Sequence, residues 1–288
     1  MQVFETPGEV SVRIRIPSGR MVIAATDTSR TEVELVPVGR RGEDAIEQIE
    51  ISHDDRSGRH VISIEQRDRI RWGPLQISWG GDVEVRVTCP TGSELELAGA
   101  STDIRADGAY GKVSARTASG DIQLGEIAGK LEVKTASGEV SVEQAQSDEL
   151  SVITVSGDVE VRRIEGSLTL RTVSGDVDLG IARGPVAVST TSGDIRLRSL
   201  EAGELRIQSV SGDSRIGVGR GTRIWVDASS ISGELSSELA MGDETPTGEP
   251  GETAQQGEGS ASGEVVPIHV KTVSGDVSIV RAAVTVAD

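Results

Sequence analysis

Apolar and polar residues alternate along most of this chain, and the alternation repeats around a Ser-Gly-acid tripeptide. Eight such tripeptides have their glycines at Gly120, Gly138, Gly157, Gly175, Gly193, Gly212, Gly233 and Gly275. The first six glycines lie 18 or 19 residues apart, the next interval is 21 residues, and the last is 42. Self-similarity at a period of about 20 residues is typical of stacked repeat proteins. The pattern therefore predicts a repeat array.

The apolar positions are the same in every repeat when they are counted from its glycine. Positions −7, −5, +2 and +4 are mostly Val, Leu or Ile, and position −3 is Thr or Ser. In the repeat around Gly157, these positions are Leu150, Val152, Val159, Val161 and Thr154. A spacing of two on each side of the glycine predicts two short strands per repeat, each with one face inward. The many β-branched residues suit a half-buried sheet.

The Ser-Gly pair marks a bend, because the inward positions are odd before it and even after it. Without a bend, a slip of one residue would turn every later side chain to the opposite face, and glycine reaches backbone conformations that cost other residues. A second column of small residues marks the return bend at Gly111, Gly129, Gly166, Gly184 and Gly203. Two strands and two bends per repeat favour an all-β fold, a parallel β-solenoid of 18–19-residue coils. An antiparallel array, in which each Ser-Gly is a hairpin turn, is the alternative.

Residues 1–100 predict a divergent, β-rich N-terminal cap that is continuous with the array. The template fits once in this region, around Gly19, with apolar residues at Val12, Ile14, Ile16, Met21 and Ile23. Further alternating runs at 33–36, 61–64, 75–79 and 83–87 are separated by longer polar stretches such as 40–44 and 53–59. Terminal repeat units are usually atypical, and Trp72 and Trp79 are candidates to plug the open end of the stack.

Residues 101–240 form the regular array in this interpretation, and residues 241–264 interrupt it. The interruption is almost entirely Gly, Glu, Thr, Ser, Pro, Gln and Ala, with six acidic groups and no Lys or Arg. Such a segment buries too little apolar surface to offset its ordering entropy, so it predicts a disordered acidic insert. The strand pattern resumes at Ile268 and Val270, and residues 265–288 predict a final coil and a closing strand.

The charge and the targeting signals limit the partners. A net charge of −17 argues against nucleic acid and anionic membranes as ligands, since both bind through Lys and Arg. No run approaches the roughly 18 consecutive apolar residues of a membrane span, and the first residues lack the features of a signal peptide. The single cysteine, Cys89, has no partner for an internal disulfide. A cytoplasmic protein with a protein partner is expected.

Candidate chemistry is sparse. His53 and His60 lie beside Asp54 and Asp55, but their spacing matches no ligand motif, and a solvated loop is the simpler interpretation. Cys89 follows alternating valines and is expected to be a buried, inert thiol. The Gly-Arg-Gly at 219–221 lacks the context of a phosphate-binding loop. The sequence therefore predicts no catalytic residue, no cofactor and no metal site.

Two polar columns accompany the repeat. Acidic residues follow the turn glycines at Asp121, Glu139, Asp158, Asp176, Asp194, Asp213, Glu234 and Asp276. A cation-stabilised β-roll is one explanation, but Ca²⁺ prefers six to eight oxygens, and each turn offers a single carboxylate. Satisfaction of turn backbone groups is the favoured role. The Thr column at −3 has the parity of an inward position, which favours a hydrogen-bonded structural role over an ice- or sugar-binding face.

The recurring Thr-x-Ser-Gly-Asp-Val, as at residues 154–159 and 172–177, resembles the bacterial putative-adhesin β-strand-repeat family, also called the toastrack domain. The opening Thr6-Pro7-Gly8 and the later Gly19-Arg20-Met21-Val22-Ile23-Ala24-Ala25 resemble it in the form of its actinobacterial members. The resemblance implies a β-solenoid-like array without established catalytic residues, often found in cell-envelope or envelope-stress contexts.

These observations favour a non-enzymatic, adhesin-like scaffold or interaction protein. A polysaccharide-binding or polysaccharide-processing β-helix protein is the alternative, but only Trp225 in the regular array is available for stacking on a sugar. A cation-stabilised β-roll is the third hypothesis.

Overall fold

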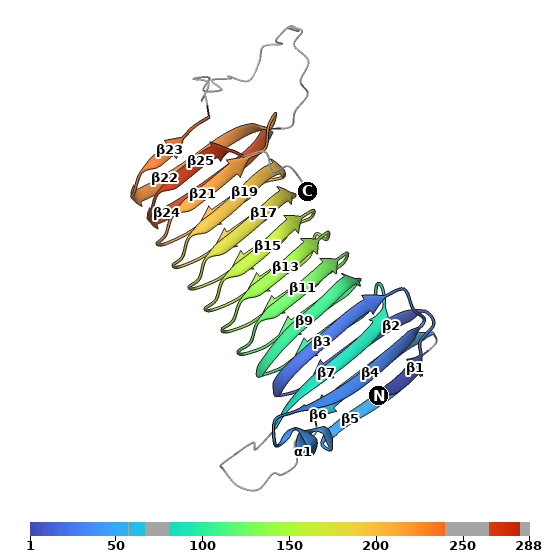
Figure 1. The fold of residues 1–288 in the computed structure, drawn as a ribbon. Helices are drawn as coiled ribbons and strands as arrows, with labels where there is room; N and C mark the ends of the chain where they lie inside the picture. Colours follow the sequence, from blue (N-terminus) through green and yellow to red (C-terminus); the bar gives the residue numbers. More distant parts are fainter. Residues whose placement is uncertain (57, 67–80, 240–264, 283–288) are drawn as a thin grey trace.

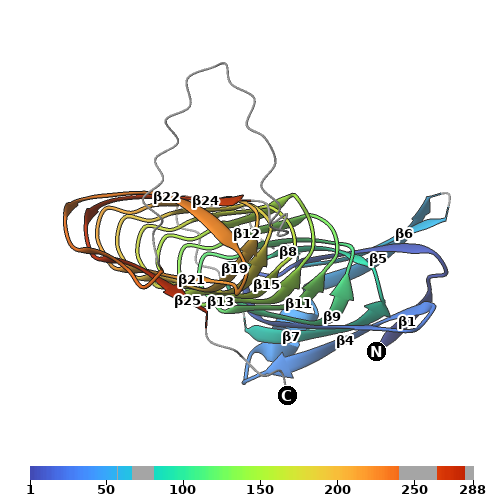
Figure 2. The ribbon, with the colours of Figure 1, turned by 90° about the horizontal axis from the view of Figure 1, so that it is seen from above.

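The computed structural model of this chain describes residues 1–56, 58–66, 81–239 and 265–282. They form two long sheets that enclose one core, as Figures 1 and 2 show. The predicted run at 75–79, both Trp72 and Trp79, and the predicted insert at 241–264 lie outside the described residues. Among the residues that are described, no helix is long and apolar enough to cross a membrane.

One sheet has 13 strands, in the spatial order β1 (Gln2–Glu5), β4 (Arg30–Val38), β7 (Asp82–Pro90), β3 (Ser18–Thr26), β9 (Ser101–Tyr110), β11 (Ile122–Ile127), β13 (Val140–Ala145), β15 (Val159–Ile164), β17 (Val177–Arg183), β19 (Ile195–Ala202), β21 (Ser214–Val218), β25 (Val277–Arg281) and β23 (Leu235–Ser237). The other has 12 strands, in the order β22 (Arg223–Ser232), β24 (Val265–Ser274), β20 (Leu205–Gln208), β18 (Val186–Ser189), β16 (Leu168–Arg171), β14 (Leu150–Ile153), β12 (Leu131–Lys134), β10 (Lys112–Arg116), β8 (Glu94–Ala98), β2 (Glu9–Arg15), β6 (Arg59–Gln66) and β5 (Ile49–Arg56). We call one strand of each sheet, with the bend between them, a coil.

Neighbouring coils of the array pair in parallel and in register. Leu131 lies opposite Leu150, and Leu150 lies opposite Leu168. The serines before the turn glycines also bridge in parallel from coil to coil, beginning with Ser101 and Ser119. The parallel solenoid is therefore confirmed, and the antiparallel hairpin array is wrong.

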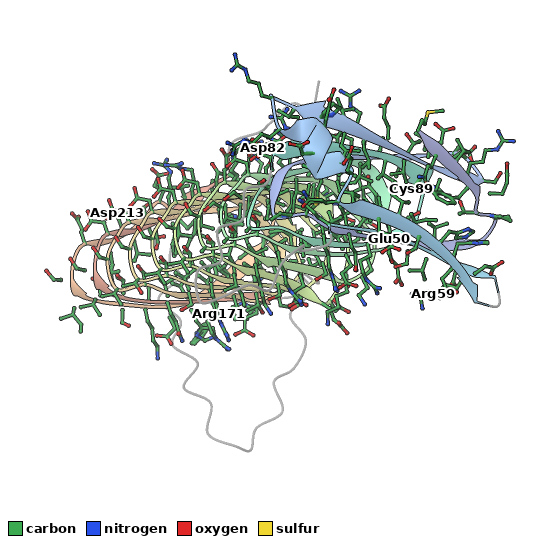
Figure 3. The ribbon with its side chains drawn as sticks, turned by 90° about the horizontal axis from the view of Figure 1, so that it is seen from below. Glu50, Arg59, Asp82, Cys89, Arg171 and Asp213 are labelled. Atoms are coloured by element: carbon green, nitrogen blue, oxygen red, sulfur yellow. The ribbon has the colours of Figure 1, made fainter. Side chains whose placement is uncertain are left out.

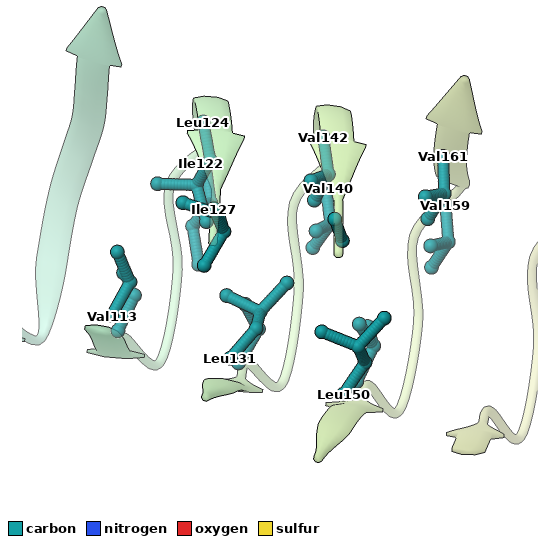
Figure 4. Packing of buried hydrophobic residues seen from close by; sticks show 14 of the residues in the cluster. Val113, Ile122, Leu124, Ile127, Leu131, Val140, Val142, Leu150, Val159 and Val161 are labelled. Atoms are coloured by element: carbon teal, nitrogen blue, oxygen red, sulfur yellow. The ribbon is translucent and has the colours of Figure 1, made fainter. Parts of the chain in front are cut away.

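The core is the space between the two inward faces. Figure 4 shows Val113, Leu131 and Leu150 of the 12-stranded sheet facing the aliphatic side chains of the 13-stranded sheet, and all three are at most 3% exposed. The predicted inward columns are buried from Val113 to Ile216 and again from Ile268 to Ile279, whereas those of residues 223–237 are only partly buried or exposed. A further inward column at +7 escaped the sequence analysis: Ile127, Ala145, Ile164, Ala182 and Leu200. Between the inward positions +4 and +7 lie two residues instead of one, so the alternation changes phase there. A strict period of two therefore does not predict the +7 column.

The turn glycines are required by backbone geometry. Gly157 has φ of 132°, and a Cβ on it would lie 2.2 Å from the carbonyl oxygen of Gly138 in the preceding coil. Both the left-handed backbone and the close approach exclude a side chain. At the return bend, a Cβ on Gly166 would lie 2.1 Å from the carbonyl oxygen of Ser147. Both predicted bends are confirmed.

The coils at the C-terminal end are not stacked in the order of the sequence. Strands β24 and β25 lie between the coil of β20 and β21 and the coil of β22 and β23, as Figure 1 shows. Residues 265–281 do form a template coil, but it is the penultimate coil in space, and residues 223–237 form the last one. We call residues 265–281 the inserted coil. Residues 219–222, which we call the bridging loop, connect β21 to β22 and pass across the inserted coil, which lies between these two strands' coils.

The N-terminal end shows the same arrangement. The coil of β2 and β3, which contains Gly19, lies between the coil of β6 and β7 and the coil of β8 and β9. Three antiparallel strands then close this end, because β4 pairs with β7, β1 pairs with β4, and β5 pairs with β6.

The polar stretches in this region are not simply loops, and the solvated loop expected around His53 and His60 is wrong. Residues 40–44 contribute to a turn and to the short helix α1 (Gly42–Ile46), which buries Ala45. Residues 53–59 are largely strand, because β5 and β6 form an antiparallel hairpin in which Asp55 lies opposite His60. The polar side chains of β5 are tolerated because this strand is the exposed edge of its sheet.

Candidate functional site

The acidic column forms a ladder of hydrogen bonds along one side of the stack. The backbone N–H of Asp176 donates to Oδ1 of Asp158 at 2.8 Å, and the N–H of Asp194 donates to Oδ1 of Asp176 at 2.9 Å. Each aspartate thus satisfies the backbone of the next coil, so a structural role is confirmed. The ladder follows spatial order, since Asp276 donates to Asp213, which Figure 3 labels. Within the described ranges, no group of three His, Cys, Asp or Glu side chains is arranged to hold a metal ion.

The Thr column lies inward, as its parity predicts. From Thr117 to Ser209, and at Thr272, its members are 2–7% exposed, and each hydroxyl donates within its own turn; Thr135 Oγ1, for example, donates to the carbonyl oxygen of Ser137 at 3.0 Å. Ser230 of the last coil is only partly buried and donates to the carbonyl oxygen of Gly275 in the neighbouring coil. These hydroxyls are therefore structural and are not presented to a ligand.

The two predicted histidines are neighbours, but they do not lie in a loop. His60 is buried, and its Nε2 donates to the carbonyl oxygen of Pro7 at 3.2 Å. Its Nδ1 is then free to accept from His53 Nε2 at 3.1 Å, and Phe4 packs edge-on against His53. The contacts join the β5–β6 hairpin to the beginning of the chain, which is a structural role.

Cys89 lies in β7 and is completely buried (Figure 3). Burial raises the pKa of the Cys89 thiol to about 11, and a hydrogen bond from Ser93 opposes the shift only in part. A buried thiol with a raised pKa is a poor nucleophile at neutral pH, so the prediction of an inert thiol is confirmed.

A hollow of about 770 Å³ lies on the outer face of the 13-stranded sheet, near its C-terminal end. Six arginines and two glutamates are the charged residues along it: Arg162, Arg196, Arg198, Arg215, Arg220, Arg281, Glu160 and Glu201. We call this site the arginine hollow. Its volume is in the usual range of ligand sites, about 300–1,000 Å³. A concentration of positive charge on a chain with a net charge of −17 makes it the candidate functional site.

Glycines create the hollow. Arg162, Gly180, Arg198 and Gly217 occupy equivalent places on β15, β17, β19 and β21, so long side chains alternate with none. Nothing larger than glycine fits, because a Cβ on Gly180 or Gly217 would lie 2.0 Å from a neighbouring carbonyl oxygen. The backbone at these positions therefore forms a floor between arginine walls.

The arginines differ in how strongly they are engaged. Arg198 donates from Nε to Oδ1 of Asp178 at 3.0 Å and from Nη2 to Oδ2 of Asp178 at 3.1 Å. This hydrogen bonding raises the pKa of Arg198 above its ordinary value. Arg162 donates to Glu143 at 2.9 Å. Arg215 and Arg220, by contrast, have no carboxylate partner among the described residues. These two guanidinium groups are free to bind a ligand.

The inserted coil contributes the last wall of the hollow. Arg281, at the end of β25, donates from Nη1 to the carbonyl oxygens of Gly219 at 3.1 Å and Thr222 at 3.4 Å. These bonds hold the bridging loop that carries Arg220. The order of the coils and the geometry of the hollow are thus connected.

The sequence did not predict this site. Arg196 and Arg215 occupy position +3 in consecutive repeats and are register partners in the sheet, so the repeat alignment carried a signal. The contribution of Arg281 had no such signal, because it depends on the insertion of the C-terminal coil. The Gly-Arg-Gly at 219–221 is indeed not a phosphate-binding loop but part of the bridging loop.

Trp225, on which the polysaccharide alternative depended, lies elsewhere. It is 49% exposed on β22 of the 12-stranded sheet, where it packs edge-on against His269. Within the part of the chain that the structure describes, none of the residues that line the arginine hollow is aromatic.

Comparisons with known proteins agree with this architecture. The family model described as Toastrack DUF4097 matches residues 11–280. No curated protein matches the sequence significantly. A crystal structure of a putative lipid binding protein from Parabacteroides distasonis is 11% identical, covers 96% of this chain and 95% of its own, and has a TM-score of 0.48.

Two more solved structures resemble the chain over nearly its full length. A putative adhesin from Parabacteroides distasonis is 11% identical, with coverage of 96% and 95% and a TM-score of 0.39. A putative cell adhesion protein from Clostridium sporogenes is 9% identical, with coverage of 97% and 98% and a TM-score of 0.23. With the family model spanning almost every coil, this chain belongs to the toastrack family.

Proposed function

We propose that this protein is a non-enzymatic scaffold that binds a partner protein at the arginine hollow. The observation that carries the proposal is the pair Arg215 and Arg220, which have no carboxylate partner among the residues with described positions and lie beside a glycine floor. Arginine is favoured at protein interfaces because its planar guanidinium forms directed, charge-assisted hydrogen bonds. Strand β21 holds Arg215 in the sheet, and the bridging loop, held by Arg281, carries Arg220.

The chemistry of the hollow supports binding rather than catalysis. Its two glutamates are already in ion pairs, Glu201 with Arg183 at 2.7 Å and Glu160 with Arg162 at 3.4 Å. A hydrolase or lyase would need a free acid and a free base beside the substrate. The described lining consists otherwise of arginines, glycines, aliphatic residues and Ser199.

A cytoplasmic location and a connection with the cell envelope are further parts of the proposal, supported by the acidic charge and the family resemblance. Cell fractionation with an antibody against the native protein tests the location. Recovery of the protein outside the cytoplasmic fraction would contradict that part and would leave the binding proposal in place.

Affinity capture from a lysate of the native cell tests the binding. The bait is the full chain, compared with the double variant Arg215→Gln/Arg220→Gln. Arg171→Gln is the matched control, because Arg171 is also an exposed arginine without a described carboxylate partner, on the opposite sheet (Figure 3). A partner captured by the wild type and the control, but lost with the double variant, supports the proposal. Equal capture by all three baits would contradict it.

A further inference from the structure

We propose that the arginine hollow is a binding site for a short acidic peptide segment, and that the inserted C-terminal coil assembles it. This inference rests on the proposed function and adds the chemistry of the ligand and the part of the chain that controls the site.

Geometry indicates the size of the ligand. Arg196, Arg215 and Arg281 come from three successive strands, β19, β21 and β25. Arg196 and Arg215 are register partners, whereas Arg281 lies opposite Val218, three residues further along the strands. With about 4.8 Å between strands and about 3.3 Å between residues, Arg281 is about 10 Å across and about 10 Å along the sheet from Arg196, roughly 14 Å or four extended residues in all. A segment of a few residues with two or three Asp or Glu side chains therefore fits the three arginines.

Charge and lining indicate the class of ligand. Carboxylates match the guanidinium fork in bidentate geometry. A sugar polymer is disfavoured, because no described lining residue is aromatic. Long polyanions are disfavoured too, because most of the surface repels them: the chain has 46 acidic and 29 basic residues. A short acidic segment interacts mainly with the local arginines, since charges beyond about 8 Å are largely screened at physiological ionic strength.

The inserted coil controls the site through Arg281. Its two hydrogen bonds to the bridging loop hold the backbone on both sides of Arg220. Val280 and Ala282, from the same coil, also line the hollow. If the inserted coil leaves, the hollow loses one wall, one arginine and the support of a second arginine. A ligand that binds only the assembled hollow must stabilise the inserted coil by the same coupling free energy.

The experiment titrates the full chain with a synthetic hexa-glutamate peptide by calorimetry at low salt. We expect the wild type to bind the peptide saturably. The affinity should be at least about tenfold weaker for Arg215→Gln/Arg220→Gln, because each substitution removes one or more charge-assisted hydrogen bonds to the peptide. The affinity of Arg171→Gln should equal that of the wild type. A neutral hexa-glutamine peptide should not bind. Equal affinity of all three proteins for hexa-glutamate, or tighter binding of a galacturonate hexamer, would overturn the peptide assignment.

Hydrogen exchange followed by mass spectrometry tests the control by the inserted coil. Saturating hexa-glutamate should slow amide exchange in residues 265–281 while leaving residues 122–164 unchanged. Ile268→Ala, which changes the opposite sheet and not the hollow, should weaken peptide binding while exchange in residues 122–164 stays as in the wild type. Unchanged exchange in residues 265–281 under saturating peptide would overturn the assembly by the inserted coil.

The outcomes separate the two levels of the proposal. Hollow-dependent capture of a native partner without hexa-glutamate binding would overturn the ligand class and leave the proposed function standing. Failure of both would overturn both.

Discussion

The middle of this protein and its two ends use the same coil but stack it differently. From β8 to β21 every coil lies on the one that precedes it in the sequence. At each end, the coil nearest the chain terminus lies one level further in, underneath a coil formed by a more central part of the sequence. Because all coils share one template, any of them has the hydrogen-bonding groups to occupy any level, so the template alone does not decide the order.

Apolar burial explains the order at the C-terminal end. At equivalent positions, the inserted coil has Ile268, Val270 and Ile279 where the last coil has Val226, Ala228 and Ser237. The coil with larger apolar side chains is covered on both sides, and its inward residues are at most 5% exposed. The less apolar coil lies at the end, where Leu235 is 48% exposed. Since each buried Å² of apolar surface is worth about 25 cal/mol, this order is the more stable one.

The two ends differ in how they are closed. The outer N-terminal coil is covered by the antiparallel strands β4 and β5, so Ile62, Ile64 and Val85 are completely buried. Beyond β22 and β23, no further strand lies within the described ranges, and Ile231 is 82% exposed. Charged residues on an edge strand oppose pairing with another chain, and the β5 edge carries Asp54 and Asp55. The C-terminal edge exposes Ile231 instead, so it is the more prone of the two to pair with another chain.

The largest expected effect compares a turn glycine in the middle with one at the end. Gly175→Ala combines left-handed backbone strain at φ of 126° with a Cβ 2.3 Å from the carbonyl oxygen of Gly157. We expect it to lower the free energy of unfolding by about 4 kcal/mol. Gly233→Ala should cost less than about 2 kcal/mol, because the last coil is free to move outward. Urea denaturation measures both, and equal losses would show that the end coil is as constrained as the middle.

Engineered disulfides test the order of the coils directly. Gln208 and Lys271 are register partners on an exposed face, and so are Lys271 and Ser229. Gln208→Cys/Lys271→Cys should oxidise readily and stabilise the fold by about 2–4 kcal/mol, because neighbouring strands suit disulfide geometry. Gln208→Cys/Ser229→Cys should not form a bond, since two strand spacings, about 10 Å, separate these positions. Non-reducing electrophoresis and mass spectrometry read the result, and the reverse outcome would restore the order of the sequence.

Core truncations test the same order by energy. Ile268→Ala should lower the free energy of unfolding by about 3 kcal/mol, because the side chain is completely buried between two coils. Val226→Ala should cost about 1 kcal/mol, since the smaller side chain is only partly buried at the end of the stack. Chemical denaturation gives both values. A larger loss for Val226→Ala would mean that residues 223–237 lie inside and residues 265–281 outside.

A smaller effect is expected in the acidic ladder. Asp158→Ala removes the acceptor for the N–H of Asp176 and should cost about 1 kcal/mol. Glu139→Ala is the matched control, because no described N–H donates to the Glu139 carboxylate, and its cost should be close to zero. Equal losses in denaturation would argue that charge, rather than the hydrogen bond, sets the contribution of the column.

The smallest expected effect concerns calcium. Because the ladder aspartates are already used by backbone N–H groups, millimolar Ca²⁺ should shift the melting temperature by no more than about 1 °C. Differential scanning calorimetry with Ca²⁺ and with a chelator makes the comparison. A rise of about ten degrees would favour the cation-stabilised β-roll, since a ligand that binds only the folded state raises its stability.

The coil could be predicted from local patterning. Side-chain alternation is a local property, so the positions of Leu150, Thr154 and Val159 were enough to predict two strands, one bend and the inward Thr column. The regular repetition of these positions favoured the parallel solenoid, and the family resemblance implied a similar array. The hairpin of His53 and His60 was beyond this reasoning, because an edge strand tolerates the polar residues that usually indicate a loop.

The stacking order of the coils at the two ends could be learned only from the three-dimensional fold. Parallel pairing does not distinguish one repeat from another, because the strands of Val226 and Ile268 offer the same backbone hydrogen-bonding groups to a neighbouring strand. Which of the two coils lies inside depends on the total apolar burial in each of the two possible stacking orders. Residues brought together by that choice were unpredictable for the same reason. Arg281 meets the bridging loop and Arg220 only because the C-terminal coil enters the stack one level below its end.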